Sequence, residues 1–185
     1  MPISTANMRS RVEMSVCIGA ARLIGAAACS GVAVLGSVAN GAAAPAGTLM
    51  GILPPGYSST NCKEVTPSSG ILEQVDCGPN TDSSGPLSAS FYLLSSKDGL
   101  AMAFQALNSG MTMASSCPGG QASPGPWHYN SSPDQTAGQV ACGTSNSGGT
   151  TVSFVVWTDN AKLTAGLIGG TDMGSLYQWW KTKSG

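Results

Sequence analysis

Short apolar runs separated by clusters of Gly, Pro, Ser and Asn make up most of the chain after residue 48. Such runs, when turn-forming residues bound them, are typical of β-strands. The pattern predicts five strands, over residues 70–77, 87–94, 138–142, 151–157 and 163–168. A turn over 159–162 returns the last strand beside the one before it.

A helical period replaces this pattern between the second and the third predicted strand. Apolar side chains recur there at spacings of three and four residues, which places them on one face of a helix. They are Leu100, Ala103, Phe104, Leu107 and Met111. Ser95 with Asp98 predicts a capping box at the start of this helix, and Gly110 lies where the helix should end. A second helix is expected over 173–183, with lysines in its last turn, where the helix dipole favours cations.

Together these elements predict an α+β fold. We expect an antiparallel sheet of about five to six strands, with one long helix and a C-terminal helix packed on it. A short helical turn over 49–53, stopped by Pro-Pro-Gly, covers one end of the core. The length of 185 residues fits one small domain plus a leader.

Positive charge is concentrated at the beginning of the chain. Every arginine lies within the first 22 residues, and an uncharged stretch of small and apolar residues follows over 23–44. A basic head, an apolar centre and a small-residue exit are typical of a secretory signal peptide. We therefore interpret 1–44 as a signal peptide, cleaved after Ala43 or Ala44, and 45–185 as a single extracytoplasmic domain. An uncleaved membrane anchor and lipidation at Cys29 are the alternatives.

If the domain is exported, its cysteines are expected to form disulfides. The region after the leader holds four of them, Cys62, Cys77, Cys117 and Cys142. An even number of cysteines in an exported domain indicates disulfides, and four cysteines allow three pairings. We favour Cys62 with Cys77 and Cys117 with Cys142, because each pair closes a local loop. The spacing lacks the close C-x-x-C pairs of zinc sites, so we expect no metal.

An internal similarity supports this pairing. The segments QVDCG at 74–78 and QVACG at 139–143 each lead through a polar loop into an apolar strand that contains Ser-Phe. Two copies of a cysteine-bearing strand, a turn and an apolar strand predict two equivalent hairpins, each with one bridge.

Charge and motifs exclude several classes of function. Only 9% of the residues are charged and the net charge is -1, which argues against a nucleic-acid partner, since affinity for phosphates comes from Lys and Arg. The chain has neither a P-loop nor a G-x-G-x-x-G element after a strand, so we expect no nucleotide cofactor. We expect contact with a membrane only if the leader stays uncleaved and anchors the chain.

The sequence also contains few combinations of residues that could form a catalytic site. A Ser-His-Asp triad would have to use His128, the only histidine, and no G-x-S-x-G elbow accompanies it. Paired carboxylates support glycosidase chemistry at suitable separations, which linear spacing does not reveal. The acidic residues after the leader are Glu64, Glu73, Asp76, Asp82, Asp98, Asp134, Asp159 and Asp172. Most lie in turns or caps, where aspartate forms local hydrogen bonds, so we assign no catalytic residue.

Tryptophan is the remaining signal. All four tryptophans fall in the last 60 residues. Exposed aromatic side chains commonly bind sugars, peptides or partner proteins. Trp157 ends an apolar strand and is expected in the core, whereas Trp127 and Trp180 are the candidates for a binding surface.

Several short motifs, in order, resemble a small extracytoplasmic domain of actinobacteria, chiefly mycobacteria. They are LPPGY at 53–57, VDCGPN at 75–80, GP at 85–86, CPG at 117–119, PGPW at 124–127, VACG at 140–143, WT at 157–158 and LYQWW at 176–180. Similar segments occur as free secreted proteins and as the outer, sensor-type domain of some transmembrane Ser/Thr kinases. This chain carries no kinase domain, so the resemblance does not imply phosphotransfer.

The resemblance implies a role in binding a ligand or a partner in the cell envelope, and it supplies no catalytic residues. We therefore expect a secreted, non-catalytic, sensor-like binding module with an unknown envelope ligand or protein partner. The alternatives are a small secreted hydrolase that uses carboxylates or His128, and a cell-wall interaction protein.

Overall fold

The structure is a computed structural model that describes residues 48–185. The expected signal peptide over 1–44, its cleavage after Ala43 or Ala44 and the lipidation site at Cys29 lie outside the described residues. Within 48–185, no helix combines the length and the hydrophobicity that crossing a bilayer requires.

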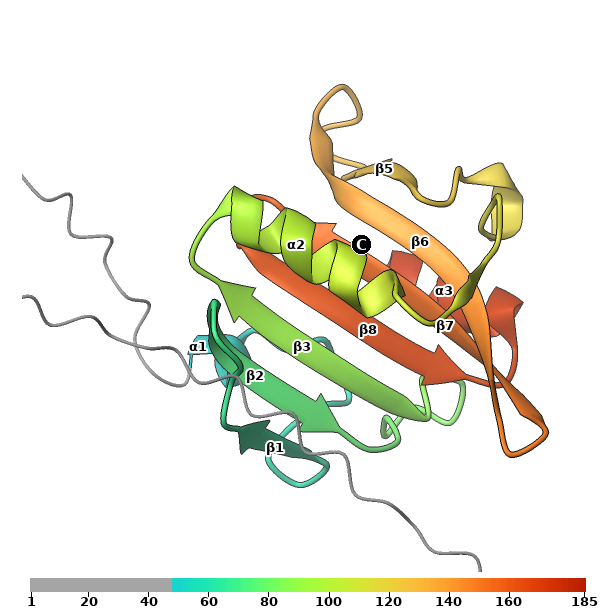
Figure 1. Cartoon of the computed structure of the whole chain (residues 1–185), viewed down its shortest axis with the longest axis horizontal. Helices are drawn as coiled ribbons and strands as arrows, with labels where there is room; N and C mark the ends of the chain where they lie inside the picture. Colours follow the sequence, from blue (N-terminus) through green and yellow to red (C-terminus); the bar gives the residue numbers. More distant parts are fainter. Residues whose placement is uncertain (1–47) are drawn as a thin grey trace, which may run out of the picture. The chain divides into compact units, whose positions relative to one another are not determined.

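Eight strands of the described region pair into one antiparallel sheet in the order β1-β2-β3-β8-β7-β6-β4, and β5 pairs with β6 outside this path (Figure 1). The strands are β1 (Cys62–Val65), β2 (Ile71–Cys77), β3 (Ser88–Leu94), β4 (Thr112–Met113), β5 (Gly125–His128), β6 (Thr136–Ser147), β7 (Thr150–Asp159) and β8 (Thr164–Gly170). The helices are α1 (Thr48–Gly51), α2 (Lys97–Asn108), the 3-10 turn η1 (Pro118–Gly120) and α3 (Met173–Lys183). The mixed α+β class predicted from the sequence is confirmed.

The expected count of five to six strands is too low. All five predicted segments form strands, as β2, β3, β6, β7 and β8, and the structure adds β1, β4 and β5. Each added strand has four residues or fewer, and β5 contains Pro126. Strands of two to four residues are too short to show a periodic sequence pattern, and proline is unusual within a strand.

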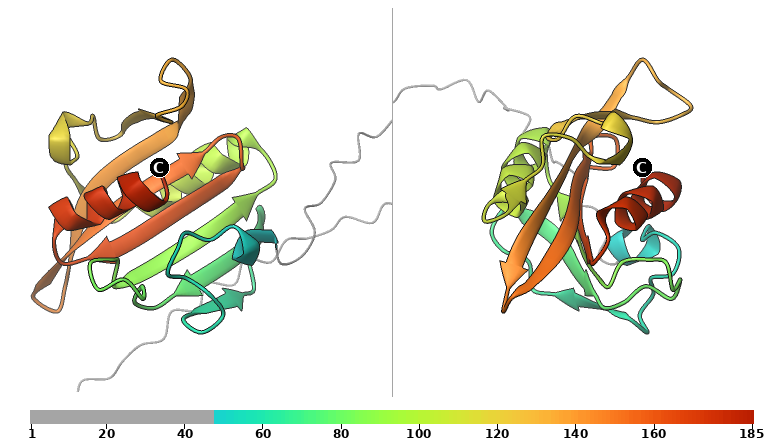
Figure 2. Two further views of the ribbon diagram at one scale, coloured as in Figure 1. Left: turned by 180° about the vertical axis from the view of Figure 1, so that it is seen from behind. Right: turned by 90° about the vertical axis from the view of Figure 1, so that its right-hand side faces the viewer.

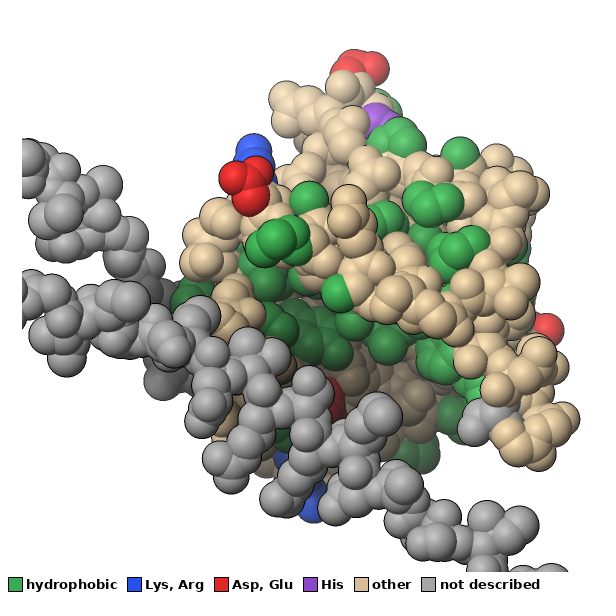
Figure 3. Space-filling view, in the orientation of Figure 1, with side chains coloured by type: hydrophobic (Ala, Val, Ile, Leu, Met, Phe, Trp, Pro, Cys, Tyr) green, Lys and Arg blue, Asp and Glu red, His purple; other side chains and the backbone are tan. Residues whose placement is uncertain are grey.

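Helices cover both faces of the sheet, with α2 on one side and α1 and α3 on the other (Figure 2). On β7, the consecutive residues Val155, Val156 and Trp157 are all buried. Val155 and Trp157 belong to the core cluster that contains Trp180, whereas Val156 packs with Phe104 of α2. A strand covered on both faces reads as a continuous apolar run, which is the pattern of β7. Charged side chains are few on the α2 face (Figure 3).

The cap of α2 differs from the prediction. Ser96, and not Ser95, is the N-cap residue, and its Oγ accepts a hydrogen bond from the backbone N–H of Gly99 at 3.1 Å. The helix ends at Asn108, just before Gly110, whose φ of 82° is the left-handed conformation that glycine adopts without strain. The predicted capping box is absent, because the helix begins one residue later than a cap at Ser95 would require.

Both predicted disulfides are present. Cys62 and Cys77 are directly opposed on β1 and β2, while Cys117 joins the segment before η1 to Cys142 on β6. The bridged residues are 15 and 25 positions apart. Loops of this length contribute about 3 kcal/mol each to stability through chain entropy. As predicted, β2 and β6 each begin a hairpin with the following strand, but each bridge reaches back to the preceding segment.

Candidate functional site

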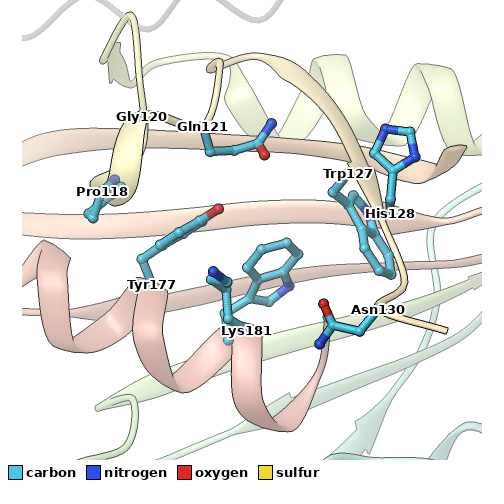
Figure 4. A pocket seen from close by; sticks show the side chains of 11 residues that line it. Pro118, Gly120, Gln121, Trp127, His128, Asn130, Tyr177 and Lys181 are labelled. Atoms are coloured by element: carbon cyan, nitrogen blue, oxygen red, sulfur yellow. The ribbon is translucent and has the colours of Figure 1, made fainter. Parts of the chain in front are cut away.

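A cleft of about 370 Å³ lies between α3 and the segment 118–130, on the α3 face of the sheet (Figure 4). It is lined by Pro118, Gly119, Gly120, Gln121, Trp127, His128, Asn130, Tyr177, Trp180, Lys181 and Gly185. The two walls are some 50 residues apart in the sequence. The fold therefore creates this site by packing α3 beside β5.

One glycine makes this packing possible. Trp127 on β5 is paired with Gly138 on β6, and a Cβ on Gly138 would lie only 1.8 Å from the carbonyl oxygen of Thr158. Without that Cβ, the indole of Trp127 lies over β6, and its N–H donates to the Thr158 carbonyl at 2.8 Å. On the other wall, the Asp172 carboxylate accepts the backbone N–H of Ser175 at 2.7 Å and caps the start of α3.

The two tryptophans that the sequence singles out lie together at the cleft, but they are not exposed. Trp127 is 3% exposed and Trp180 is 2% exposed. Their rings meet edge to face with centroids 5.6 Å apart, and Tyr177 packs on Trp180 at 5.3 Å. Because packing covers the ring faces, these indoles form a wall of the cleft and offer no stacking platform. Trp157 is buried in the core, as predicted.

Polar groups without internal partners surround the cleft. In Figure 4 the Tyr177 hydroxyl and the Lys181 amine point into the space between the walls, and Asn130 faces them from the other side. The Tyr177 hydroxyl makes no hydrogen bond within the described region, and burial raises its pKa above the ordinary value of 10.0, so the neutral, donating form is favoured further. Gln121 donates its side-chain amide N–H to the Pro126 carbonyl at 2.9 Å, and its side-chain carbonyl oxygen has no partner among the described residues.

The charged side chains that line the cleft are positive only. Lys181 is the only formally charged side chain that lines it, and no acidic side chain does. Within 48–185 the only ion pair is between Lys162 and Asp159, so Lys181 has no internal counterion there. An ammonium without a counterion in a concave site attracts anions.

The histidine of the catalytic alternative is poorly placed for proton transfer. His128 is exposed and lines the edge of the cleft, and in Figure 4 its ring turns away from Tyr177 and Lys181. Among the described residues, no carboxylate is hydrogen-bonded to its imidazole. A catalytic histidine needs such an orienting partner and a nucleophile within reach.

The carboxylates do not gather either. Asp159 lines a second pocket of about 170 Å³, where it accepts hydrogen bonds from Tyr129 and from the backbone N–H of Ala161 and pairs with Lys162 at 3.1 Å. Asp82 lines a third pocket alone among acidic side chains. None of these three pockets in the described part of the chain has the two carboxylates that glycosidases use. Residues 48–185 also contain no cluster of three potential metal ligands.

Sequence reasoning did not identify Gln121, Asn130, Tyr177 or Lys181 as site residues. A usable signal was present on α3, because Tyr177, Trp180 and Lys181 have the spacing i, i+3 and i+4, which places them on one helix face. The residues of the 118–130 wall lie in a loop and a short strand, whose shape the sequence pattern does not define.

Comparison with protein-family models, with curated proteins and with solved structures gave no match. The functional argument therefore starts from the site itself.

Proposed function

We propose that this chain is an exported, non-catalytic binding module of the cell envelope, and that the cleft between α3 and the segment 118–130 is its ligand site. The observation that carries the proposal is the set of unpartnered polar groups around the cleft. The Tyr177 hydroxyl, the Lys181 ammonium and the side-chain carbonyl of Gln121 belong to residues that line one concavity, and they have no internal partner in the described region. A concave site with a few convergent polar groups is the usual form of a small-molecule site.

Location outside the cytoplasm is supported by two independent features. Disulfides persist in oxidising compartments and are rare in the cytosol, and this domain has two of them. The basic and apolar beginning of the sequence fits an export signal. The resemblance of the short motifs to outer domains of actinobacterial kinases would fit the same location and a sensor-like role.

A binding role accounts for the site better than hydrolysis does. Tyr177 and Lys181 supply hydrogen-bond donors and charge, but no carboxylate side chain lines the cleft to act as a base. His128 is the remaining proton carrier, and it lacks an orienting partner in the described region. Groups that recognise and hold a polar ligand are therefore present, while an activated nucleophile is not.

The proposal is tested by NMR on the 15N-labelled full-length chain. Three probes of one size and different charge are titrated separately: glucose, glucosamine and glucuronate. At least one probe should shift the amide signals of Gln121, Asn130 and Tyr177 well above that of Leu72, an exposed residue of β2 that does not line the cleft. Tyr177→Phe should weaken that binding, and Lys97→Gln on α2 should not. Shifts that cluster away from the cleft, or no shifts with any of the three probes, would contradict the proposal.

A further inference from the structure

We propose, as an extension that rests on the proposed function, that the cleft selects a small hydroxylated organic acid, such as a uronic acid. The acid group would lie at Lys181, where Tyr177 and the Trp180 indole N–H add neutral donors. The hydroxyl groups of the ligand would reach Gln121 and Asn130 on the opposite wall.

The first argument is charge. Lys181 lines the cleft without a counterion in the described region, and no acidic side chain shares the lining. A cationic ligand would meet repulsion from Lys181 and find no acidic side chain in the lining. A carboxylate would gain a charge-assisted hydrogen bond, which is shorter and about twice as strong as a neutral one.

The second argument is an unused donor. The N–H of Trp180 is buried and has no acceptor within 48–185, whereas the same group of Trp127, in the adjoining ring, donates to Thr158. A buried donor without a partner costs about 1–3 kcal/mol, so such groups are rare unless a ligand or a water supplies the acceptor. The N–H of Trp179 on the same helix also lacks an acceptor, but only Trp180 belongs to the lining of this cleft, so a molecule seated there is a candidate source of its acceptor.

The third argument is the balance of donors and acceptors. Near α3 the lining holds the Lys181 ammonium, the Tyr177 hydroxyl and, behind them, the buried indole N–H of Trp180, which all donate. An ionised carboxylate is an acceptor-only group with two oxygens, so it complements this wall. Across the cleft, the free Gln121 carbonyl and the Asn130 amide match hydroxyl groups, which both donate and accept.

The three probes of the NMR experiment decide between ligand classes. Glucuronate and glucose differ only by a carboxylate in place of a hydroxymethyl group. Glucuronate should bind about tenfold more tightly than glucose, as expected for one hydrogen bond to a charged group. Lys181→Gln should reduce this preference to less than about twofold, while Lys181→Arg, which keeps the charge, should retain most of it. Lys97→Gln, on the opposite face, should leave the preference unchanged.

Trp180→Phe supplies a second, independent readout. It removes the N–H and keeps an aromatic ring, so glucuronate binding should weaken even though the charge of the cleft is unchanged. Unfolding curves of each variant check that the fold persists.

The outcomes separate the two proposals. If glucose or glucosamine binds in the cleft as tightly as glucuronate, the acid preference is wrong and the binding site stands. If Lys181→Gln retains the full preference for glucuronate, the assigned role of Lys181 is wrong. If none of the three probes shifts the cleft signals, both the ligand class and the proposed function are contradicted.

Discussion

The indole of Trp127 meets that of Trp180 edge to face, with centroids 5.6 Å apart and planes at 81°, yet only the N–H of Trp127 has an acceptor in the described structure. This contact joins β5 to α3 and so sets the width of the cleft. The two residues therefore differ in role, since Trp127 is anchored by the sheet while Trp180 keeps a free donor.

This difference predicts unequal effects of the same substitution. Trp127→Phe leaves the Thr158 carbonyl without its donor and should cost about 1–3 kcal/mol of unfolding free energy beyond the loss of ring contacts. Trp180→Phe removes an unsatisfied donor and should cost less. Urea unfolding of the two variants measures both values. A larger loss for Trp180→Phe would mean that its N–H already has a strong partner.

Gly138 should tolerate no side chain. A Cβ there would lie 1.8 Å from the Thr158 carbonyl oxygen and 2.8 Å from Nε1 of Trp127. Gly138→Ala must therefore displace β5 or β7, at a cost of about 1–3 kcal/mol by comparison with other overpacked sites. Gly51→Ala is the control, because a Cβ there meets nothing within 4 Å. Thermal unfolding compares the two variants, and equal midpoints would show that Gly138 does not pack tightly against Thr158 and Trp127.

The two disulfides should differ in their effect on the cleft. Replacing either pair by serines should lower the unfolding free energy by about 3 kcal/mol. Only the Cys117–Cys142 pair holds the segment that leads into η1, which lines the cleft. Its loss should also weaken glucuronate binding, whereas loss of Cys62–Cys77 should leave binding intact. Calorimetric titration of both double variants tests this, and equal loss of binding would mean that the bridges act through global stability alone.

Alkaline pH should destabilise the fold through Tyr57. Burial raises the pKa of its hydroxyl from 10.0 to about 12. The unfolded chain then loses this proton at a lower pH than the folded chain does. Stability is therefore complete below pH 10 and falls as the pH rises towards 12. Tyr57→Phe should show a smaller fall over this interval in urea unfolding, and an unchanged slope would contradict the assignment.

The predictable parts of the fold are those with many buried side chains. Phe104 and its helical neighbours specify α2, and the apolar run through Val155 specifies β7, because burial leaves a periodic or continuous apolar pattern. The Cys117–Cys142 bridge followed from loop length. In contrast, β4 has two residues and β5 contains Pro126, so neither shows a strand pattern.

The candidate site was predicted only in part. The sequence indicated Trp127 and Trp180, but it does not reveal which faces of a ring other side chains cover, so they were expected to be exposed. The sequence explains Lys181 only as a cation that the dipole favours in the last turn of a helix. Its position across the cleft from Asn130 depends on how α3 packs on the sheet, which the sequence pattern does not show. A site formed between distant segments requires the tertiary structure.

The most direct measurement follows the indole N–H signals of Trp127 and Trp180 in the full-length chain as glucuronate is added. We predict that the Trp180 signal shifts in a saturable manner and shows a nuclear Overhauser contact to the sugar, while the Trp127 signal stays close to its original position. A stationary Trp180 signal, with binding detected elsewhere or not at all, would contradict the account.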